Sequence, residues 1–253
     1  MSADRGIALG EAAGPPGMRL YAIGDVHGRL DLLSALHGKI GAEIARDRPA
    51  DWRIIHVGDY IDRGPCSRGV LDFLIGKSSA DERNIALAGN HDLGLLWFLA
   101  KPRANTLFTR HGGFQTALSY GVTADFSSNE AARDTACRLD AAIPESHTRF
   151  LTGLARSVSF GDFFFCHAGI RPGLALDRQD PEDLIWIRDD FLGWAGLHPK
   201  VIVHGHTPVA APDLRPNHVN IDTGAYSSGI LSALVIEGRL TRILQETGGS
   251  TAA

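Results

Sequence analysis

The chain has few cysteines, and their spacing excludes a disulfide-stabilised or zinc-ribbon protein. Its three cysteines, Cys66, Cys137 and Cys166, are odd in number and form no CxxC pair. Unpaired thiols are typical of a reducing compartment, so we expect a cytoplasmic protein. Cys166 ends the apolar run 163–166, and we expect it to be a core thiol rather than a nucleophile or ligand.

Long apolar runs and an excess of positive charge are also missing. No run reaches the roughly 20 residues that a membrane helix needs, so we expect no membrane association. The net charge of −4 offers no basic surface, and we expect no nucleic-acid partner. Residues 1–17 carry acidic residues and prolines instead of a signal peptide's apolar stretch. We expect 1–17 to be a flexible N-terminal extension and 248–253 a flexible tail.

What remains is an ordinary globular composition, with 44% apolar and 21% charged residues over 253 positions. Apolar strands alternate with helical stretches, which predicts an α/β fold and a single domain over 18–247. The predicted helices are 30–45 and 67–74, and the predicted strands are 20–23, 52–57, 85–88, 157–160, 163–166, 200–203, 219–222, 231–237 and 240–245. Residues 93–150 have few strand signals, and we interpret them as a helical cap or insertion that influences substrate choice.

Five short segments place carboxylate, imidazole or amide side chains beside glycine. They read GDVHG at 24–28, GDYIDRG at 58–64, GNHD at 89–92, HAG at 167–169 and GHT at 205–207. Each lies at or near the end of a predicted strand. Because open α/β sheets bind ligands outside the carboxyl ends of their strands, we expect these segments to form one site.

The residue types in these segments are those of a metal centre with an acid beside it. Asp25 and His27 are two apart, so in an extended strand their side chains share a side and can hold one cation. Asp59 has two oxygens and could bridge two metals. Asn90 offers a neutral amide oxygen, and the adjacent His91 would face the substrate as a general acid.

Other residues keep two readings at this point. Asp62 is the first candidate to orient His91, and Asp92 is the second. Taken alone, Asp62 with Arg63 would more often be a surface ion pair on a turn. Arg188 could hold a phosphate through its forked guanidinium or simply pair with a neighbouring aspartate.

Two further imidazoles, His167 and His206, end apolar strands and are candidate ligands. Alone, either histidine would more often be structural. His204 lies two residues before His206, and it could be a ligand or a donor that orients one.

Taken together and in this order, the segments resemble the calcineurin-like metallophosphoesterases, and more narrowly the bacterial and phage branch of the phosphoprotein phosphatase family. The resemblance spans about 18–229 and implies a sandwich of two β-sheets flanked by helices, with the cap inserted. It implies one metal at Asp25, His27 and Asp59, and a second at Asp59, Asn90, His167 and His206. The catalytic residues that it implies are His91 as the acid, Asp62 as its partner, and Arg63 and Arg188 as phosphate clamps.

The resemblance implies a two-metal phosphomonoesterase that acts on phosphoserine or phosphothreonine, and also phosphotyrosine, by attack of a metal-bridging hydroxide. Its partners would be a phosphorylated protein or a small phosphoester. Manganese is the metal expected from the family, while Fe, Zn, Co and Ni suit the same ligands. A reading without catalysis, as an inactive metal-stabilised binding module, is disfavoured because no expected ligand or acid is missing.

The alternative activity is hydrolysis of a dinucleoside polyphosphate or a capped RNA, since GNHD with HAGI also resembles the diadenosine tetraphosphate hydrolases. Those hydrolases usually lack the second aspartate of GDxxDRG. The presence of Asp62 is therefore the reason that the sequence favours a protein phosphatase.

Overall fold

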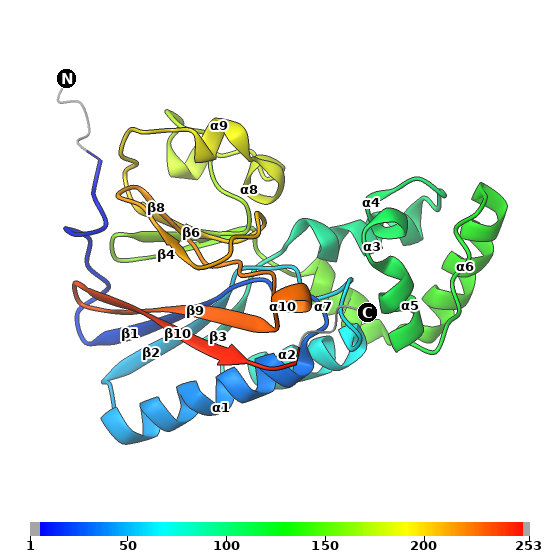
Figure 1. The fold of residues 1–253 in the computed structure, drawn as a ribbon, viewed down its shortest axis with the longest axis horizontal. Helices are drawn as coiled ribbons and strands as arrows, with labels where there is room; N and C mark the ends of the chain where they lie inside the picture. The colour runs from blue at the N-terminus through cyan, green and yellow to red at the C-terminus, as the bar shows by residue number, and fades with distance from the viewer. Residues whose placement is uncertain (1–5, 250–253) are drawn as a thin grey trace.

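The computed structural model describes residues 6–249, and it stacks two five-stranded sheets face to face (Figure 1). The first sheet has, in spatial order, β10 (Leu240–Thr247), β9 (Ile230–Glu237), β1 (Met18–Ile23), β2 (Asp51–His56) and β3 (Asn84–Ala86). The second has β4 (Ser157–Phe160), β5 (Phe163–Cys166), β6 (Val201–His204), β8 (His218–Asn220) and β7 (Asp213–Leu214). One apolar cluster joins inward side chains from both sheets, among them Ile55, Phe165 and Leu234. The predicted α/β sandwich is confirmed.

Parallel pairing brings the ends of distant strands to one edge of the sandwich. In the first sheet, β1, β2 and β3 run parallel, and Ile23 pairs with His56 at the end of the ladder. In the second, β5 and β6 run parallel, and Phe165 pairs with Val203. The loops after these strands carry all five glycine-framed segments, so the pairing assembles a site from residues far apart in sequence.

Helices cover the outer face of each sheet. The helices α1 (Leu30–Asp47) and α2 (Ser67–Ala80) lie against the first sheet, below it in Figure 1. The inward side of α1 buries Leu32, Leu36 and Ile40 at the spacing of one helix face. The short helices η1 (Leu176–Arg178), α8 (Asp183–Trp186) and α9 (Asp189–Leu192) belong to the segment over the second sheet, where Phe191 packs in a separate apolar cluster.

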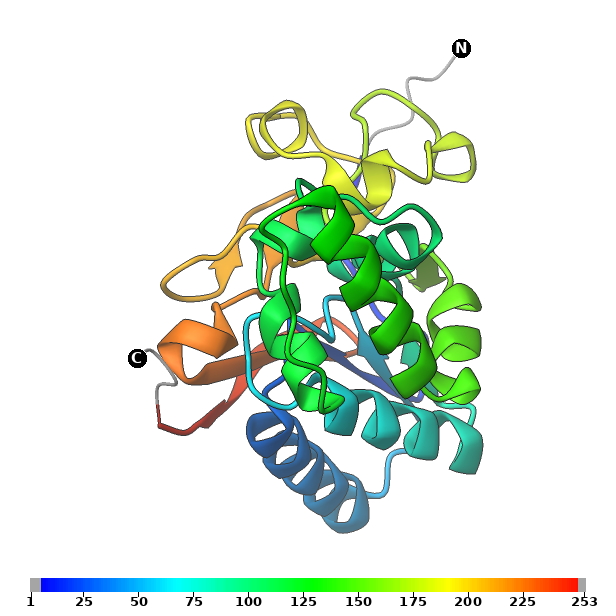
Figure 2. The same ribbon diagram turned by 90° about the vertical axis from the view of Figure 1, so that its right-hand side faces the viewer.

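The predicted cap is helical and lies to one side of the sandwich, as Figures 1 and 2 show. It contains α3 (Asn90–Ala100), α4 (Leu107–Arg110), α5 (Gly113–Ser119), α6 (Asn129–Ala142) and α7 (Glu145–Thr152). Its first helix begins at Asn90, earlier than the predicted boundary at 93. Two candidate site residues, Asn90 and His91, therefore belong to the cap's own first turn.

Both chain ends differ from the expected flexible segments where they are described. Ile7 forms a β-bridge with His198, Ala12 is fully buried, and the backbone N–H of Ala13 donates to Asp162 at 2.9 Å. The physical reason is that apolar side chains of this segment join the cluster between the sheets. At the other end, the N–H of Gly248 donates to the Gly229 carbonyl at 2.9 Å. Residues 1–5 and 250–253 lie outside the described part.

No helix within the described residues is long and apolar enough to cross a bilayer. The short helix α10 (Ala225–Ser228) precedes β9 and lies beside the strand-end loops.

Candidate metal centre and active site

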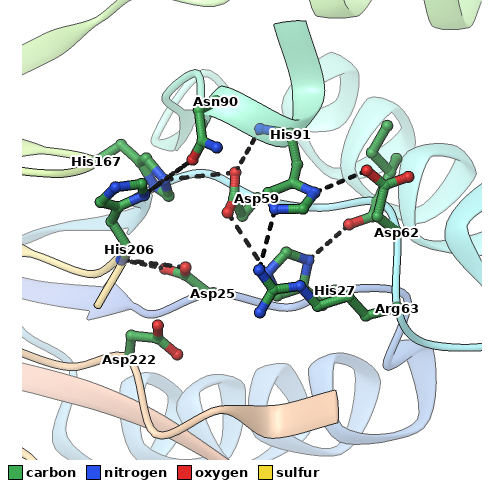
Figure 3. A network of polar contacts seen from close by, with 12 residues as sticks. Asp25, His27, Asp59, Asp62, Arg63, Asn90, His91, His167, His206 and Asp222 are labelled. Atoms are coloured by element: carbon green, nitrogen blue, oxygen red, sulfur yellow. Dashed lines mark hydrogen bonds and ion pairs between the residues drawn. The ribbon is translucent and has the colours of Figure 1, made fainter. Parts of the chain in front are cut away.

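The six side chains predicted as metal ligands lie together at the strand-end edge (Figure 3). Each is at most 5% exposed, so the site is closed to bulk water on most sides. They come from loops after four strands and from the start of α3: Asp25, His27, Asp59, Asn90, His167 and His206.

On one side of Asp59, four ligand atoms converge, and several of the facing pairs consist of two hydrogen-bond acceptors. His167 Nε2 lies 2.9 Å from Asn90 Oδ1 and 3.4 Å from Asp59 Oδ1. The other ring nitrogen, Nδ1, faces the Val57 carbonyl at 3.1 Å and can only donate to it, so Nε2 keeps a lone pair. Burial also lowers the pKa of His167 and keeps it neutral. His206 Nδ1 completes the group, 2.9 Å from Asn90 Oδ1.

On the other side of Asp59, a second histidine presents a lone pair to the second oxygen. His27 Nε2 lies 3.4 Å from Asp59 Oδ2, while His27 Nδ1 donates to the Ile61 carbonyl at 2.7 Å. Burial lowers the pKa of His27 to about 3, so the ring stays neutral near pH 7. One oxygen of Asp59 thus faces His167 and the other faces His27, which fits a carboxylate that could bridge two metals.

These separations fit two metal positions. Ligand atoms held at 2.0–2.2 Å from a metal, at octahedral to tetrahedral angles, lie roughly 2.8–3.6 Å apart. The facing acceptors lie 2.9 to 3.4 Å apart, and a cation between them would turn a repulsive contact into coordination. Aspartate, asparagine and histidine together suit several first-row divalent ions, so the donor set does not select one.

Asp25 occupies a different place from the other candidates. The compact ligand groups in the described chain are His27 with Asp59 and His91, and Asp59 with His167 and His206. Asp25 belongs to neither group, although the backbone N–H of His206 donates to its Oδ2 at 3.1 Å.

Asp25 instead lies beside a second carboxylate, Asp222, which the sequence analysis did not single out (Figure 3). Burial raises the pKa of Asp25, and the neighbouring Asp222 raises it further. Burial likewise raises the pKa of Asp222, to about 6. A nearby cation would relieve this crowding of buried carboxylates. The signal was present, because Asp222 ends the predicted strand 219–222.

The loops that carry the site have strained backbones. Five site residues have positive φ angles between 43° and 69°, and the only other such non-glycine residue in the described chain is Arg48, at the end of α1. The five are His27, Asp59, Asp62, Arg63 and His206. Each such conformation costs on the order of 1–3 kcal/mol and persists only where its surroundings enforce it.

Asp92 enforces one of these turns. Its buried carboxylate accepts the backbone N–H groups of Asp59 at 2.8 Å, Tyr60 at 2.9 Å and Gly89 at 2.9 Å. It was the second candidate to orient His91, but it fixes the Asp59 loop instead. Asp62, the first candidate, has the contact: His91 Nδ1 donates to its Oδ2 at 2.7 Å.

The charge state of His91 follows from this pair. Burial opposes its protonation, but the Asp59 carboxylate and the hydrogen bond to Asp62 outweigh burial and raise the pKa of His91. Its Nε2 lies 3.2 Å from Arg63 Nη2, which can only donate, so this hydrogen bond exists while Nε2 is unprotonated. Asp62 thus fixes one ring nitrogen, and a protonated His91 would offer the other as a proton donor.

The cap supports the loop that carries Asp62 and Arg63. The hydroxyl of Thr116, on α5, donates to Asp62 Oδ1 at 2.6 Å and accepts the Asp62 N–H at 2.9 Å. The Arg63 N–H points at the Gly112 carbonyl at 3.4 Å, and a Cβ on Gly112 would collide with the Arg63 backbone. Sequence reasoning missed Thr116 because a threonine in a helical segment carries no signal of this contact.

The two candidate phosphate clamps lie on different sides. The Arg63 guanidinium lies 4.7 Å over the ring of Tyr226, a contact that the sequence did not indicate. Arg188 is exposed, and its charge acts against protonation of both His167 and His206, which places it within electrostatic reach of them.

His204, left open between ligand and orienting donor, belongs to neither group of ligands. Its ring packs 5.0 Å from the Phe191 ring and 5.2 Å from the His218 ring. Its Nδ1 points to the carbonyl of the next residue at 3.1 Å. Cys166 is a core thiol as expected, with its Sγ donating to the Gly169 carbonyl at 3.3 Å.

A two-sheet sandwich with histidine, aspartate and asparagine gathered at its strand ends defines a metallophosphoesterase. The model of the family described as calcineurin-like phosphoesterase matches residues 18–226. The chain therefore belongs to this family of hydrolases, whose members use divalent metal ions.

Curated relatives match more than four fifths of the chain. The chain is 29% identical over 230 residues to the asymmetrical bis(5'-nucleosyl)-tetraphosphatase PrpE of Anoxybacillus flavithermus, covering 84% of this chain and 88% of the relative. It is 28% identical to the PrpE of Halalkalibacterium halodurans, covering 86% and 89%.

Solved structures support the fold. A structure described as a candidate diadenosine tetraphosphatase has a TM-score of 0.64 at 20% identity, covering 94% of this chain and all of that one. A cold-active protein tyrosine phosphatase has a TM-score of 0.59 at 17% identity, covering 93% and 81%. Solved structures described as a tetraphosphatase and as a protein phosphatase thus share this two-sheet fold.

Proposed function

We propose that this protein hydrolyses dinucleoside polyphosphates, cleaving a dinucleoside tetraphosphate asymmetrically into a nucleoside monophosphate and a nucleoside triphosphate. The observation that carries the proposal is the agreement of relatives at 27–29% identity, matched over 84–86% of this chain, which are named for this activity. This reverses the order of the two activities inferred from the sequence, where the phosphoprotein reading came first.

The site offers the groups that such a reaction uses. Bound at the two positions flanking Asp59, divalent metals would activate water and neutralise phosphoryl charge. Arg63 and Arg188 lie on either side of the centre and can hold phosphate oxygens through their forked donors. His91, held by Asp62, can donate a proton to the departing oxygen or hydrogen-bond to it.

Hydrolysis of phosphoserine or phosphothreonine is the second candidate, favoured by the buried pair of Asp62 and His91. An alkoxide leaving group needs a proton far more than a nucleotide does, because a phosphate is stable as an anion near neutral pH. A well-oriented acid is therefore more valuable in a phosphomonoesterase. The pair serves either substrate, so it does not outweigh the relatives.

The test compares diadenosine tetraphosphate with a phosphoserine peptide at matched concentrations and with manganese added. We expect faster turnover of the dinucleotide, with AMP and ATP as products separated by anion-exchange chromatography. Asp59→Asn, purified in parallel, controls for contaminating hydrolases. Faster turnover of the phosphopeptide would overturn the proposal, and two molecules of ADP would contradict the asymmetric cleavage.

A further inference from the structure

A separate hollow opens beside the metal centre, on the segment over the second sheet. It has a volume of about 330 Å³, within the range of roughly 300–1,000 Å³ that is usual for small-molecule sites. Its walls come from one short stretch and one arginine: Arg171, Asp183, Trp186, Ile187, Arg188, Asp189 and Asp190.

The position of Trp186 connects this hollow to the candidate metal ligands. The Trp186 ring stands edge-on to the ring of His206, with centroids 6.1 Å apart and planes at 86°. The side chain is 36% exposed although an indole gains much by burial. A large aromatic surface is therefore left accessible next to a ligand of the proposed second metal.

The charges in the hollow distinguish its two ends. Arg188 forms no ion pair with any residue of the described chain, so its guanidinium remains available for a phosphate near His206. Arg171 is occupied, because it pairs with Asp183 at 2.7 Å and with Asp190 at 3.4 Å. Arg171 thus compensates the charges of Asp183 and Asp190, while Asp189 forms no ion pair within the described residues and can accept a hydrogen bond from an amino group.

We propose that this hollow, which we call the Trp186 pocket, binds the nucleobase of a nucleotide whose phosphate lies at Arg188 and the metal centre. The inference rests on the proposed function. It assigns a binding place to the base, whereas the metal centre and the arginines account only for the phosphates. Stacking on an aromatic side chain suits any base, because every base has a π-face. The unpaired Asp189 suits bases with an exocyclic amino group, such as adenine.

The test measures equilibrium binding by calorimetry on the manganese-loaded protein, using AMP and ribose 5-phosphate as probes. AMP carries adenine where ribose 5-phosphate has its anomeric hydroxyl, so the ratio of their affinities reports chiefly the base. We expect AMP to bind more tightly in the unaltered protein. Trp186→Ala should weaken AMP roughly 5–100-fold, about 1–3 kcal/mol, and leave ribose 5-phosphate unchanged.

Two controls separate stacking from a general disturbance. Trp186→Phe keeps an aromatic face and should retain most of the preference for AMP, even if the alanine variant folds poorly. Trp194→Ala removes a similarly exposed tryptophan, 45% against 36%, that does not line the pocket, and it should change neither affinity.

The outcomes also separate this inference from the proposed function. Equal affinities for the two probes, or equal losses in Trp186→Ala, would overturn the Trp186 pocket even if diadenosine tetraphosphate is a good substrate. A base preference that depends on Trp186, without hydrolysis of the dinucleotide, would support the pocket and refute the proposed function.

Discussion

Replacing Asp62 with asparagine tests whether His91 acts as a proton donor. The substitution keeps the shape of the side chain but removes the charge that faces His91 Nδ1 at 2.7 Å. Both partners are at most 2% exposed, so water cannot substitute for the lost carboxylate. A hydrogen bond to a charged group contributes about 1.5–3 kcal/mol. At about 1.4 kcal/mol per tenfold, that corresponds to a loss of roughly 10–150-fold in a step that needs the protonated ring.

The size of the loss should depend on the leaving group. Phenyl phosphate releases a phenol with a pKa of about 10, like that of tyrosine, and needs the donated proton. p-Nitrophenyl phosphate releases a more stable anion and needs it less. We therefore expect Asp62→Asn to lower kcat by roughly 10–150-fold on phenyl phosphate and by less than about 5-fold on p-nitrophenyl phosphate.

The pH profile gives an independent readout. Asp62 and Asp59 raise the pKa of His91, against the effect of burial, and the acid is active only while protonated. Activity should therefore fall as the pH rises through that pKa, and Asp62→Asn should move this alkaline limb to lower pH. Thr116→Val is the matched control, since it removes a neighbour of Asp62 but leaves its charge. Equal losses on both substrates, or loss of bound metal in Asp62→Asn, would refute the reasoning.

Three further predictions concern the metals and the core. Manganese at about 100 times its Kd should stabilise the protein by about 2.7 kcal/mol in thermal melts, an effect absent in Asp59→Asn. His91→Asn should lose turnover but keep its metal content by elemental analysis; an emptied site would make His91 a ligand. Burial lowers the pKa of His56 to about 4. The free energy of unfolding should therefore fall by about 3 kcal/mol as the pH drops from 6.5 to 4, because His56 binds a proton in the unfolded state and not in the folded state. His56 Nε2 lies 2.9 Å from His37 Nε2, and replacing both by Leu should flatten this dependence in urea melts, whereas an unchanged slope would contradict it.

The fold and the positions of most site residues could be predicted because their signals are local. Apolar periodicity marks the strands, and a ligand-type residue beside glycine marks the point where each strand ends. Asp59, Asn90 and His167 follow this rule, and parallel pairing then brings them together without further information. The localisation in the cytoplasm and the identity of the metals stay predictions.

Contacts made across the tertiary structure could not be predicted in the same way. Thr116 reaches Asp62 only because α5 folds back over the loop, and Tyr226 reaches Arg63 only because α10 lies beside it. Aspartate tolerates the positive φ angles seen at Asp59 and Asp62, but which aspartates of the chain adopt them depends on such neighbours. The 6–17 segment packs because the sandwich leaves apolar surface for it, which depends on both sheets being present.

The choice of substrate was the least predictable property, and the structure gives the reason. Asp62 was the residue on which the sequence separated a protein phosphatase from a dinucleotide hydrolase. Among the described side chains, however, only His91 and Thr116 form hydrogen bonds with its carboxylate. If His91 is the proton donor, those contacts would govern how the proton is delivered, and both reactions could use it. What differs between the substrates is the group beyond the phosphate, and such a group would meet residues like Trp186 outside the five glycine-framed segments. Specificity in this chain should therefore change more with Trp186 than with Asp62.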